Sequence, residues 1–194
     1  SDFTITNPPT YPLNIAADEI VVFEVTFNPT NFGTRNAIVN ISNTSSNFPN
    51  FKFNIQGTGK NAEIAVTGNS IDIPNGNTAV SAIVNTLLGI ANLNPANPTT
   101  ASKTFVITNS GNIDLSLSGI TITGADASLF TVSPITSTIA AGATGNVTVT
   151  FAPISTGVKN AVINIANNDE TDNENPYTFA VQGNATSFIA CEPG

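Results

Sequence analysis

An internal repeat is the strongest constraint that this sequence places on its fold. Four blocks match in the same order: 2–5 with 129–132, 25–29 with 149–153, 33–41 with 157–165, and 53–57 with 179–183. The offset is 124 residues for the two central blocks, 126 for the last and 127 for the first. Differences of two or three residues in the offset indicate changes in loop length, which surface loops tolerate. The chain is therefore expected to fold as copies of one module.

The two copies of the repeat are not equally long. Residues 62–128 precede the second copy, and no counterpart of them lies ahead of Ser1. We therefore expect residues 1–60 to be the C-terminal half of a module without its front strands, and 61–185 to be a complete module. Residues 186–194 are expected to be the first strand of a further one. The missing strands either belong to a longer chain, which we favour, or come from another chain by strand addition.

The pattern inside the complete module is typical of β-strands. Ile, Val and Thr supply 62 of the 194 residues, and β-branched side chains favour strands over helices. Apolar side chains alternate with polar ones along 146–151, and strands are also expected at 62–67, 103–108, 115–123, 130–132 and near 79–84. Seven or eight half-buried strands joined by Gly, Asn and Pro turns predict an all-β fold of tandem immunoglobulin-like β-sandwich modules. Phe105, Phe130, Phe151 and Phe179 are expected to fill the centre.

Composition removes several classes of function. The chain has no His, which excludes Ser-His-Asp and Cys-His nucleophile activation and His-containing zinc sites. With 5 basic against 13 acidic residues, it lacks the clustered cations that nucleic acids require. No apolar run approaches the length of a membrane span, so direct membrane insertion is not expected. We expect a protein that is not an enzyme and uses no cofactor. The single Cys191 cannot form an internal disulfide and is expected as a buried free thiol.

Several ordered motifs of the second module resemble one known family. They are Thr104 to Gly111, Gly119 to Phe130, Ile139 to Gly142, Val149 to Pro153, and Asn175 to Gly183. Together they resemble the choice-of-anchor D repeat of bacterial surface proteins, which is related to the abnormal-spindle and hydin type of immunoglobulin-like domain. The resemblance covers residues 62–185 in full, and residues 1–59 resemble the back half of the same repeat.

The resemblance implies a module of a large secreted bacterial protein. Neutral polar side chains, rather than charged ones, are expected to hydrate the surface, since the chain has 28 Asn, 27 Thr and 15 Ser. This composition also favours an extracellular, cell-surface location. We therefore expect a structural repeat module of a surface filament, stalk or adhesin. Its expected partners are copies of itself or neighbouring modules of the same long chain, with a cell-surface or glycan ligand as a further partner.

One loop carries the densest charge of the sequence. Asp169, Glu170, Asp172 and Glu174 lie between the last two strands of the second module, and carboxylates are ligands that Ca²⁺ prefers. The alternative is a solvated hairpin loop. The spacing does not follow the EF-hand order, and the equivalent segment 43–50 of the first module has no carboxylate. The loop is a calcium candidate, and the solvated loop is the favoured interpretation.

A second class of function remains open. In this alternative the chain is a ligand-recognition module that binds a glycan or a protein through loops at one end. The segment 78–102 is long and apolar for a loop, so Leu87, Leu88, Ile90 and Leu93 are the candidate binding surface. The competing interpretation is a strand that completes a sheet edge and covers the core. Burial of these side chains favours the scaffold, whereas an exposed apolar patch favours the binding face.

Overall fold

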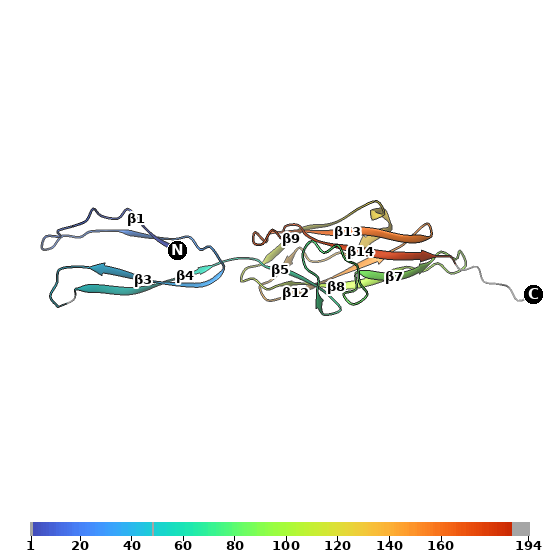
Figure 1. Cartoon of the computed structure of the whole chain (residues 1–194), viewed down its shortest axis with the longest axis horizontal. Helices are drawn as coiled ribbons and strands as arrows, with labels where there is room; N and C mark the ends of the chain where they lie inside the picture. Colours follow the sequence, from blue (N-terminus) through green and yellow to red (C-terminus); the bar gives the residue numbers. More distant parts are fainter. Residues whose placement is uncertain (1, 48, 188–194) are drawn as a thin grey trace, which may run out of the picture. The chain divides into compact units, whose positions relative to one another are not determined.

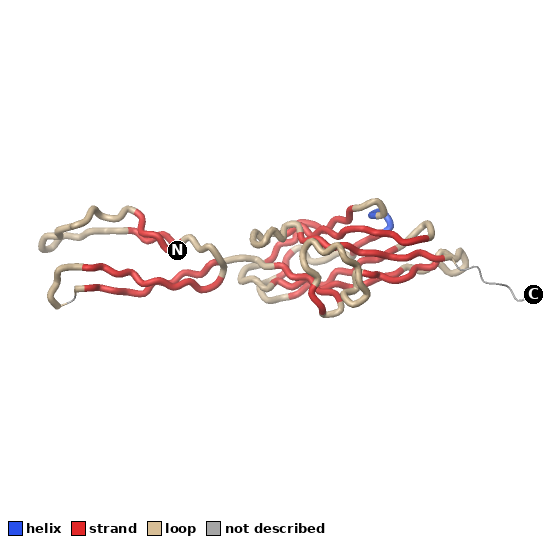
Figure 2. Tube along the Cα trace, in the orientation of Figure 1, coloured by secondary structure: helices blue, strands red, loops and turns tan. Residues whose placement is uncertain are grey.

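Strands make up almost all of the regular structure, in agreement with the β-branched composition (Figure 2). The computed structural model of the chain describes residues 2–47 and 49–187. The chain divides into two compact units, residues 1–60 and 61–194, which we call unit 1 and unit 2. Among the described residues no helix has the length and apolar character needed to cross a bilayer.

Unit 1 consists of two hairpin-like pairs of strands (Figure 1). The strands are β1 (Phe3–Thr6), β2 (Glu24–Phe27), β3 (Gly33–Ser42) and β4 (Asn50–Gly59). β1 pairs with β2, and β3 pairs with β4, both antiparallel. An ion pair of 2.7 Å between the carboxylate of Asp2 and Nε of Arg35 ties the start of β1 to β3.

Unit 2 is a sandwich of two five-stranded sheets (Figure 1). One sheet has the order β10-β12-β8-β5-β6 and the other the order β11-β9-β13-β14-β7. The strands are β5 (Ile64–Gly68), β6 (Ile71–Asp72), β7 (Leu87–Asn92), β8 (Ala101–Asn109), β9 (Leu115–Thr123), β10 (Phe130–Val132), β11 (Thr138–Ile139), β12 (Thr144–Phe151), β13 (Gly157–Asn167) and β14 (Tyr177–Thr186). One 3₁₀ turn, Ala127–Leu129, precedes β10. All pairings between these strands are antiparallel except that of β14 with β7.

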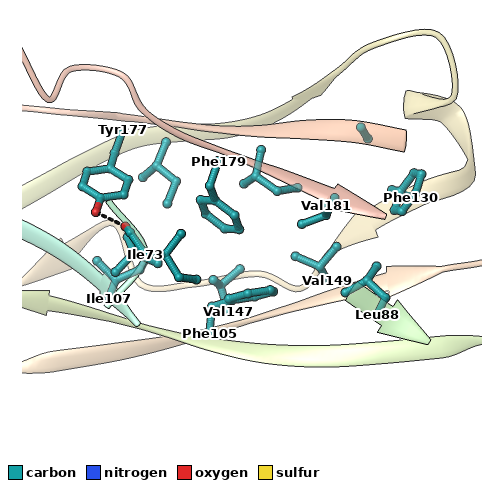
Figure 3. Close-up of a cluster of buried hydrophobic side chains, with 14 of the residues drawn as sticks. Ile73, Leu88, Phe105, Ile107, Phe130, Val147, Val149, Tyr177, Phe179 and Val181 are labelled. Carbon is teal, nitrogen blue, oxygen red and sulfur yellow. Dashed lines mark hydrogen bonds between the residues drawn. The ribbon is translucent and has the colours of Figure 1, made fainter. Parts of the chain in front are cut away.

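The core of unit 2 lies between the two sheets, as Figure 3 shows. Phe179 and Val181 of β14 point from one layer toward Phe105 and Val147 of the other (Figure 3). The Phe105 and Phe179 rings lie 5.0 Å apart between centroids. The four expected phenylalanines, Phe105, Phe130, Phe151 and Phe179, are all buried, so this prediction is confirmed. They occupy the centre that a Trp and a disulfide fill in antibody domains.

The sequence repeat is also a repeat of strand pairing. Phe3 pairs with Phe27 in unit 1 as Phe130 pairs with Phe151 in unit 2. The ring centroids of these two pairs are 4.8 and 4.9 Å apart, at interplanar angles of 35° and 32°. β3 and β4 likewise keep the register of β13 and β14. Unit 1 therefore has the arrangement of the last strands of unit 2.

The strand pattern differs from the expectation in detail. Unit 2 has ten strands within its described residues rather than seven or eight, because β6 and β11 are two-residue pieces that sequence alternation cannot reveal. The segment 79–84 is not a strand but turn and irregular structure that leads into β7. Cys191 and most of the expected strand at 186–194 lie outside the described residues.

Candidate functional site

The two candidate regions of the sequence lie at opposite ends of β14. The acidic loop 168–176 connects β13 to the start of β14. β7 pairs with the other end of β14, at Gln182 to Thr186. The backbone of Leu93 then donates a hydrogen bond of 2.8 Å to the carbonyl of Thr186. The two regions are therefore separate surfaces of unit 2.

Three carboxylates meet at the acidic end of unit 2. One carboxylate oxygen from each of Glu63, Asp169 and Glu174 lies within 4.8 Å of the others. Asp169 is 1% exposed, whereas Glu63 and Glu174 are half-buried. Glu63 precedes β5, and the other two belong to the loop between β13 and β14. We call these three residues the acidic cluster.

Asp169 uses its carboxylate to hold the chain together. Its Oδ2 accepts a 2.9 Å hydrogen bond from the backbone N–H of Ile64, the first residue of β5. Its Oδ1 accepts from the backbone N–H and the hydroxyl of Thr171, at 2.9 and 2.8 Å. A buried carboxylate that accepts several protein N–H and O–H groups is stabilised without a metal ion. Asp169 therefore joins the β13–β14 loop to the first strand of the facing sheet.

The Thr171 hydroxyl links two carboxylates. Its oxygen lies 2.8 Å from Oδ1 of Asp169 and 3.0 Å from Oε2 of Glu63. A hydroxyl has one proton, so it donates to only one of these acceptors at a time. Burial is the largest cause that raises the pKa of Glu63, and the charges of Asp169 and Asp172 raise it further. A proton on Glu63 would satisfy both contacts.

Glu174 is the most perturbed acid of the cluster. Burial, followed by repulsion from the charges of Asp169, Glu63, Asp172 and Asp72, raises the pKa of Glu174 to about 7. Its backbone carbonyl accepts a 2.8 Å hydrogen bond from the amide of Asn167, which fixes this part of the loop. The Glu174 carboxyl therefore titrates near neutral pH, where a small change in pH or in the neighbouring charges alters its own charge.

The structure brings two of the four sequence candidates together. Asp169 and Glu174 belong to the acidic cluster, whereas Glu170 and Asp172 are exposed on the loop outside it. Glu63 was not among the candidates, because it lies more than 100 residues earlier and no local pattern connects it with the loop. Three carboxylates could contribute oxygens to one divalent cation, but calcium takes six to eight ligands. Within the described residues the cluster supplies only part of such a set.

The equivalent loop of unit 1 shows what the fold itself requires here. Asn43 of unit 1 aligns with Asn167 of unit 2. The Asn43 amide contacts the carbonyl of Ile41 and the N–H of Ser45, at 3.4 and 2.8 Å. The Asn167 amide makes the corresponding contacts, with the carbonyl of Ile165 and the N–H of Asp169. The asparagine turn is therefore common to both copies, and the carboxylate at Asp169 is an addition of unit 2.

The apolar candidates lie along and just beyond β7. Leu88 is 2% exposed, and Leu93 packs against the core as a half-buried side chain. Leu87 is half-buried, whereas Ile90 is 63% exposed. The register with β14 shifts beside Leu88, and Gly89 takes a φ of 121° that side chains rarely adopt. This bulge turns Leu88 inward, so Ile90 alone of the four faces solvent.

Comparison with known protein families gives a match within unit 2. Residues 92–184, from the end of β7 to Asn184 near the end of β14, match the HYDIN/CFA65/VesB-like family of Ig-like domains. These residues form an immunoglobulin-like domain of the hydin type. The matched range includes β8 to β13 and the whole acidic loop. No curated protein matches the chain significantly over its sequence.

Solved structures of low sequence identity resemble parts of the chain. The VesB protease of Vibrio cholerae is 18% identical over 50% of this chain and 30% of its own, with a TM-score of 0.35. The PapD-like domain 7 of human CEP192 is 18% identical over 69% of this chain and 91% of its own, with a TM-score of 0.37. A Porphyromonas gingivalis protein of unknown function is 16% identical over 95% of this chain and all of its own, with a TM-score of 0.41. The chain thus spans less than a third of the length of the Vibrio protease.

Proposed function

We propose that this chain is a structural repeat module of a large extracellular bacterial surface filament, stalk or adhesin. In this role a module keeps a fixed length between its ends, and its partners are neighbouring modules or copies of itself. The finer assignment to the choice-of-anchor D repeat of bacterial surface proteins is part of the same proposal. The match to an Ig-like domain supports a non-catalytic module.

The repeated strand pairing is the observation that carries this proposal. Two copies of one strand arrangement occur in a single chain with the same register and the same Phe–Phe pair. Repetition of a compact unit is how proteins build length, since each unit contacts mainly its neighbours. The many neutral polar side chains supply hydrogen bonds to water without a high charge.

The recognition alternative has less support. Leu88 and Leu93 contribute to the core, so they are not available to a ligand. Ile90 is the one fully exposed side chain of the four candidates, and single exposed apolar side chains are ordinary on a protein surface. The packing of β7 thus favours its interpretation as an edge strand that closes the sheet.

Labelling of intact cells tests the location. Antibodies raised against residues 1–194 should decorate the surface of unbroken source cells, and external protease should remove the signal. Labelling only after the cells are broken would contradict an extracellular role.

A loop exchange separates scaffold from recognition. Replacing residues 94–98 with a short Gly-Ser linker, together with Ile90→Ser, should leave attachment of the cells to host or abiotic surfaces unchanged if the module is a spacer. Loss of attachment, with surface labelling and thermal stability retained, would favour the recognition module. A substitution at exposed Ile154, which lies outside both candidate regions, is the matched control.

A further inference from the structure

The inward face of unit 1 is open. Phe51 and Phe53 of β4 are 56% and 38% exposed, and Ile41 of β3 is 38% exposed. Their aligned residues in unit 2, Tyr177, Phe179 and Ile165, are at most 2% exposed. The same positions of the same repeat are thus covered in one copy and uncovered in the other.

Unit 2 shows what covers these positions. There β12 pairs with β8, β13 pairs with β9, and β14 pairs with β7. In unit 1 the equivalent strands β2, β3 and β4 have no such neighbours within the described residues. Apart from the end of β4 at Gly59, no described strand lies on these outer edges, and unpaired strand edges are templates for strand addition.

The rest of the half-sandwich is already assembled. A Cβ built on Gly57 would lie 2.7 Å from the ring of Phe27, because this ring packs directly on the β4 backbone. Gly183 and Phe151 make the corresponding contact in unit 2. The two strand pairs of unit 1 therefore face each other as they do in the complete module, and the free edges are held in position for a partner.

The size of the open face suits a stable interface. Phe51, Phe53, Ile41 and Ile5, the last of them 47% exposed, leave on the order of 400 Å² of apolar side chain open to solvent. This is as large as the largest patch on a typical monomer, and a standard interface buries about 800 Å² per partner, somewhat more than half of it apolar.

We propose that the open face of unit 1 binds the front strands of another module of this same repeat. The occupant contributes antiparallel strands to the free edges of β2 and β3 and a parallel strand to β4, as β8, β9 and β7 do in unit 2. Residues 61–127 are the example of such an occupant within this chain. The inference goes beyond the proposed function, since strand addition here does not depend on where the protein is located.

A second copy of this chain is a poor source of those strands. Its own residues 61–127 carry Phe105, Ile107 and Leu115, all fully buried in unit 2. Their transfer to another chain would expose that core and so destabilise the module that donates them. The occupant is therefore a front half that is not already engaged in its own module.

A chimera tests the proposal directly. Ser1 aligns with Ser128, so a second copy of residues 61–127 placed directly before Ser1 of the full chain joins the strands at the natural point of the repeat. Hydrogen exchange of the β2, β3 and β4 amides is then compared between the chimera and residues 1–194. We expect exchange at the free edges to slow at least ten-fold, together with loss of binding of an apolar dye.

A matched control carries Ile107→Pro in the added copy only, which disrupts the strand that should pair with β2. It should return the exchange of β2 to that of the unmodified chain. Equal exchange in the chimera and the unmodified chain would overturn the proposal. Protection in the unmodified chain that rises with concentration, together with dimers in sedimentation velocity, would also overturn it and identify a second copy as the occupant.

Discussion

At the scale of single residues, buried polar side chains decide how the strands of unit 2 connect. Asn109 is fully buried at the end of β8, and its amide nitrogen donates to the carbonyls of Ile113 and Ile139, at 2.8 and 2.9 Å. Its oxygen accepts from the N–H groups of Glu63 and Gly111. One side chain therefore satisfies backbone groups near β5, β9 and β11, and every hydrogen-bonding position of the amide is used.

Asp169 has a comparable role, and its removal should be costly. Asp169→Ala leaves the buried N–H of Ile64 without an acceptor, so we expect unit 2 to lose about 2–3 kcal/mol of unfolding free energy. Urea denaturation followed by fluorescence or circular dichroism measures the loss. Glu170→Ala at the exposed neighbouring position is the control and should change stability by less than about 0.5 kcal/mol. Equal effects of the two substitutions would show that the contact with Ile64 is unimportant.

The pKa of Glu174 predicts a dependence of stability on pH. The folded-state pKa of about 7 lies above the ordinary value of 4.5, so the folded protein binds this proton more tightly than the unfolded chain does. Unit 2 should therefore be more stable at pH 5 than at pH 8, by on the order of 1 kcal/mol after solvent screening of this half-exposed group. The stability is lost as the pH rises from about 4.5 through 7. Urea midpoints measured across this range give the slope.

Two comparisons make the pH prediction specific to the acidic cluster. Glu174→Gln should flatten the slope, whereas Glu170→Gln should leave it unchanged. Calcium provides the second comparison, because a cation bound to Glu63, Asp169 and Glu174 would favour their charged forms. A rise in the midpoint at pH 8 with millimolar calcium, absent from Glu174→Gln, would favour the calcium interpretation over a solvated loop.

At the scale of elements, a glycine in the last strand sets the distance between the two sheets. Gly183 of β14 lies under the ring of Phe151 from the facing sheet, and a Cβ there would be 2.3 Å from the ring. Gly57 of β4 meets Phe27 in the same way in unit 1. The repeat thus keeps glycine at this position because an aromatic ring packs directly on the strand.

The two glycines should respond differently to substitution. Phe151 is fully buried and cannot move aside, so Gly183→Ala should destabilise unit 2 by about 3 kcal/mol, near the upper end of overpacking costs. Phe27 is half-buried and can rotate toward solvent, so Gly57→Ala should cost unit 1 about 1 kcal/mol. Urea denaturation monitored by hydrogen exchange resolves the two units separately. A larger cost at Gly57 would show that Phe27 is as confined as Phe151.

At the scale of the whole molecule, the two units differ greatly in buried core. Twenty-three buried apolar residues form the core cluster of unit 2, whereas Val39 is the one buried apolar side chain among the described residues of unit 1. Since apolar burial is the main favourable term in folding, unit 1 by itself has little to offset its loss of chain entropy. The stability of the molecule is therefore concentrated in unit 2.

This difference predicts two separate unfolding steps. In residues 1–194 we expect the amides of β1 to β4 to exchange at least 100-fold faster than those of β8, β12, β13 and β14. A brief digestion with a nonspecific protease should cut within residues 2–60 first and leave a resistant fragment that contains unit 2. Mass spectrometry of the digest identifies the cut sites. A single transition with uniform protection would contradict the prediction.

The sequence by itself determined the repeat, the all-β class and the inward positions of the core. Alternation along β12 and β13 reports which side chains are inside, because successive residues of a strand face opposite sides. The four buried phenylalanines follow from the same pattern. The asparagine turn at Asn43 and Asn167 also follows from aligned residues, since its contacts lie within two positions along the chain.

Only the tertiary structure decided which distant residues meet. Glu63 joins Asp169 and Glu174 because β5 begins beside the β13–β14 loop, and no local pattern carries this information. The bulge at Leu88 interrupts the alternation along β7. Leu88 and Ala91 are buried, whereas Ile90, which regular alternation would place on the same side as Leu88, is exposed. That unit 1 lacks its front strands follows from the repeat, whereas only the structure shows which of its inward side chains stay exposed. Phe51 and Ile5 are exposed, while Phe27 is half-buried against Gly57. Alternation cannot make this distinction, because it marks a side chain as inward whether or not a second layer is there to cover it.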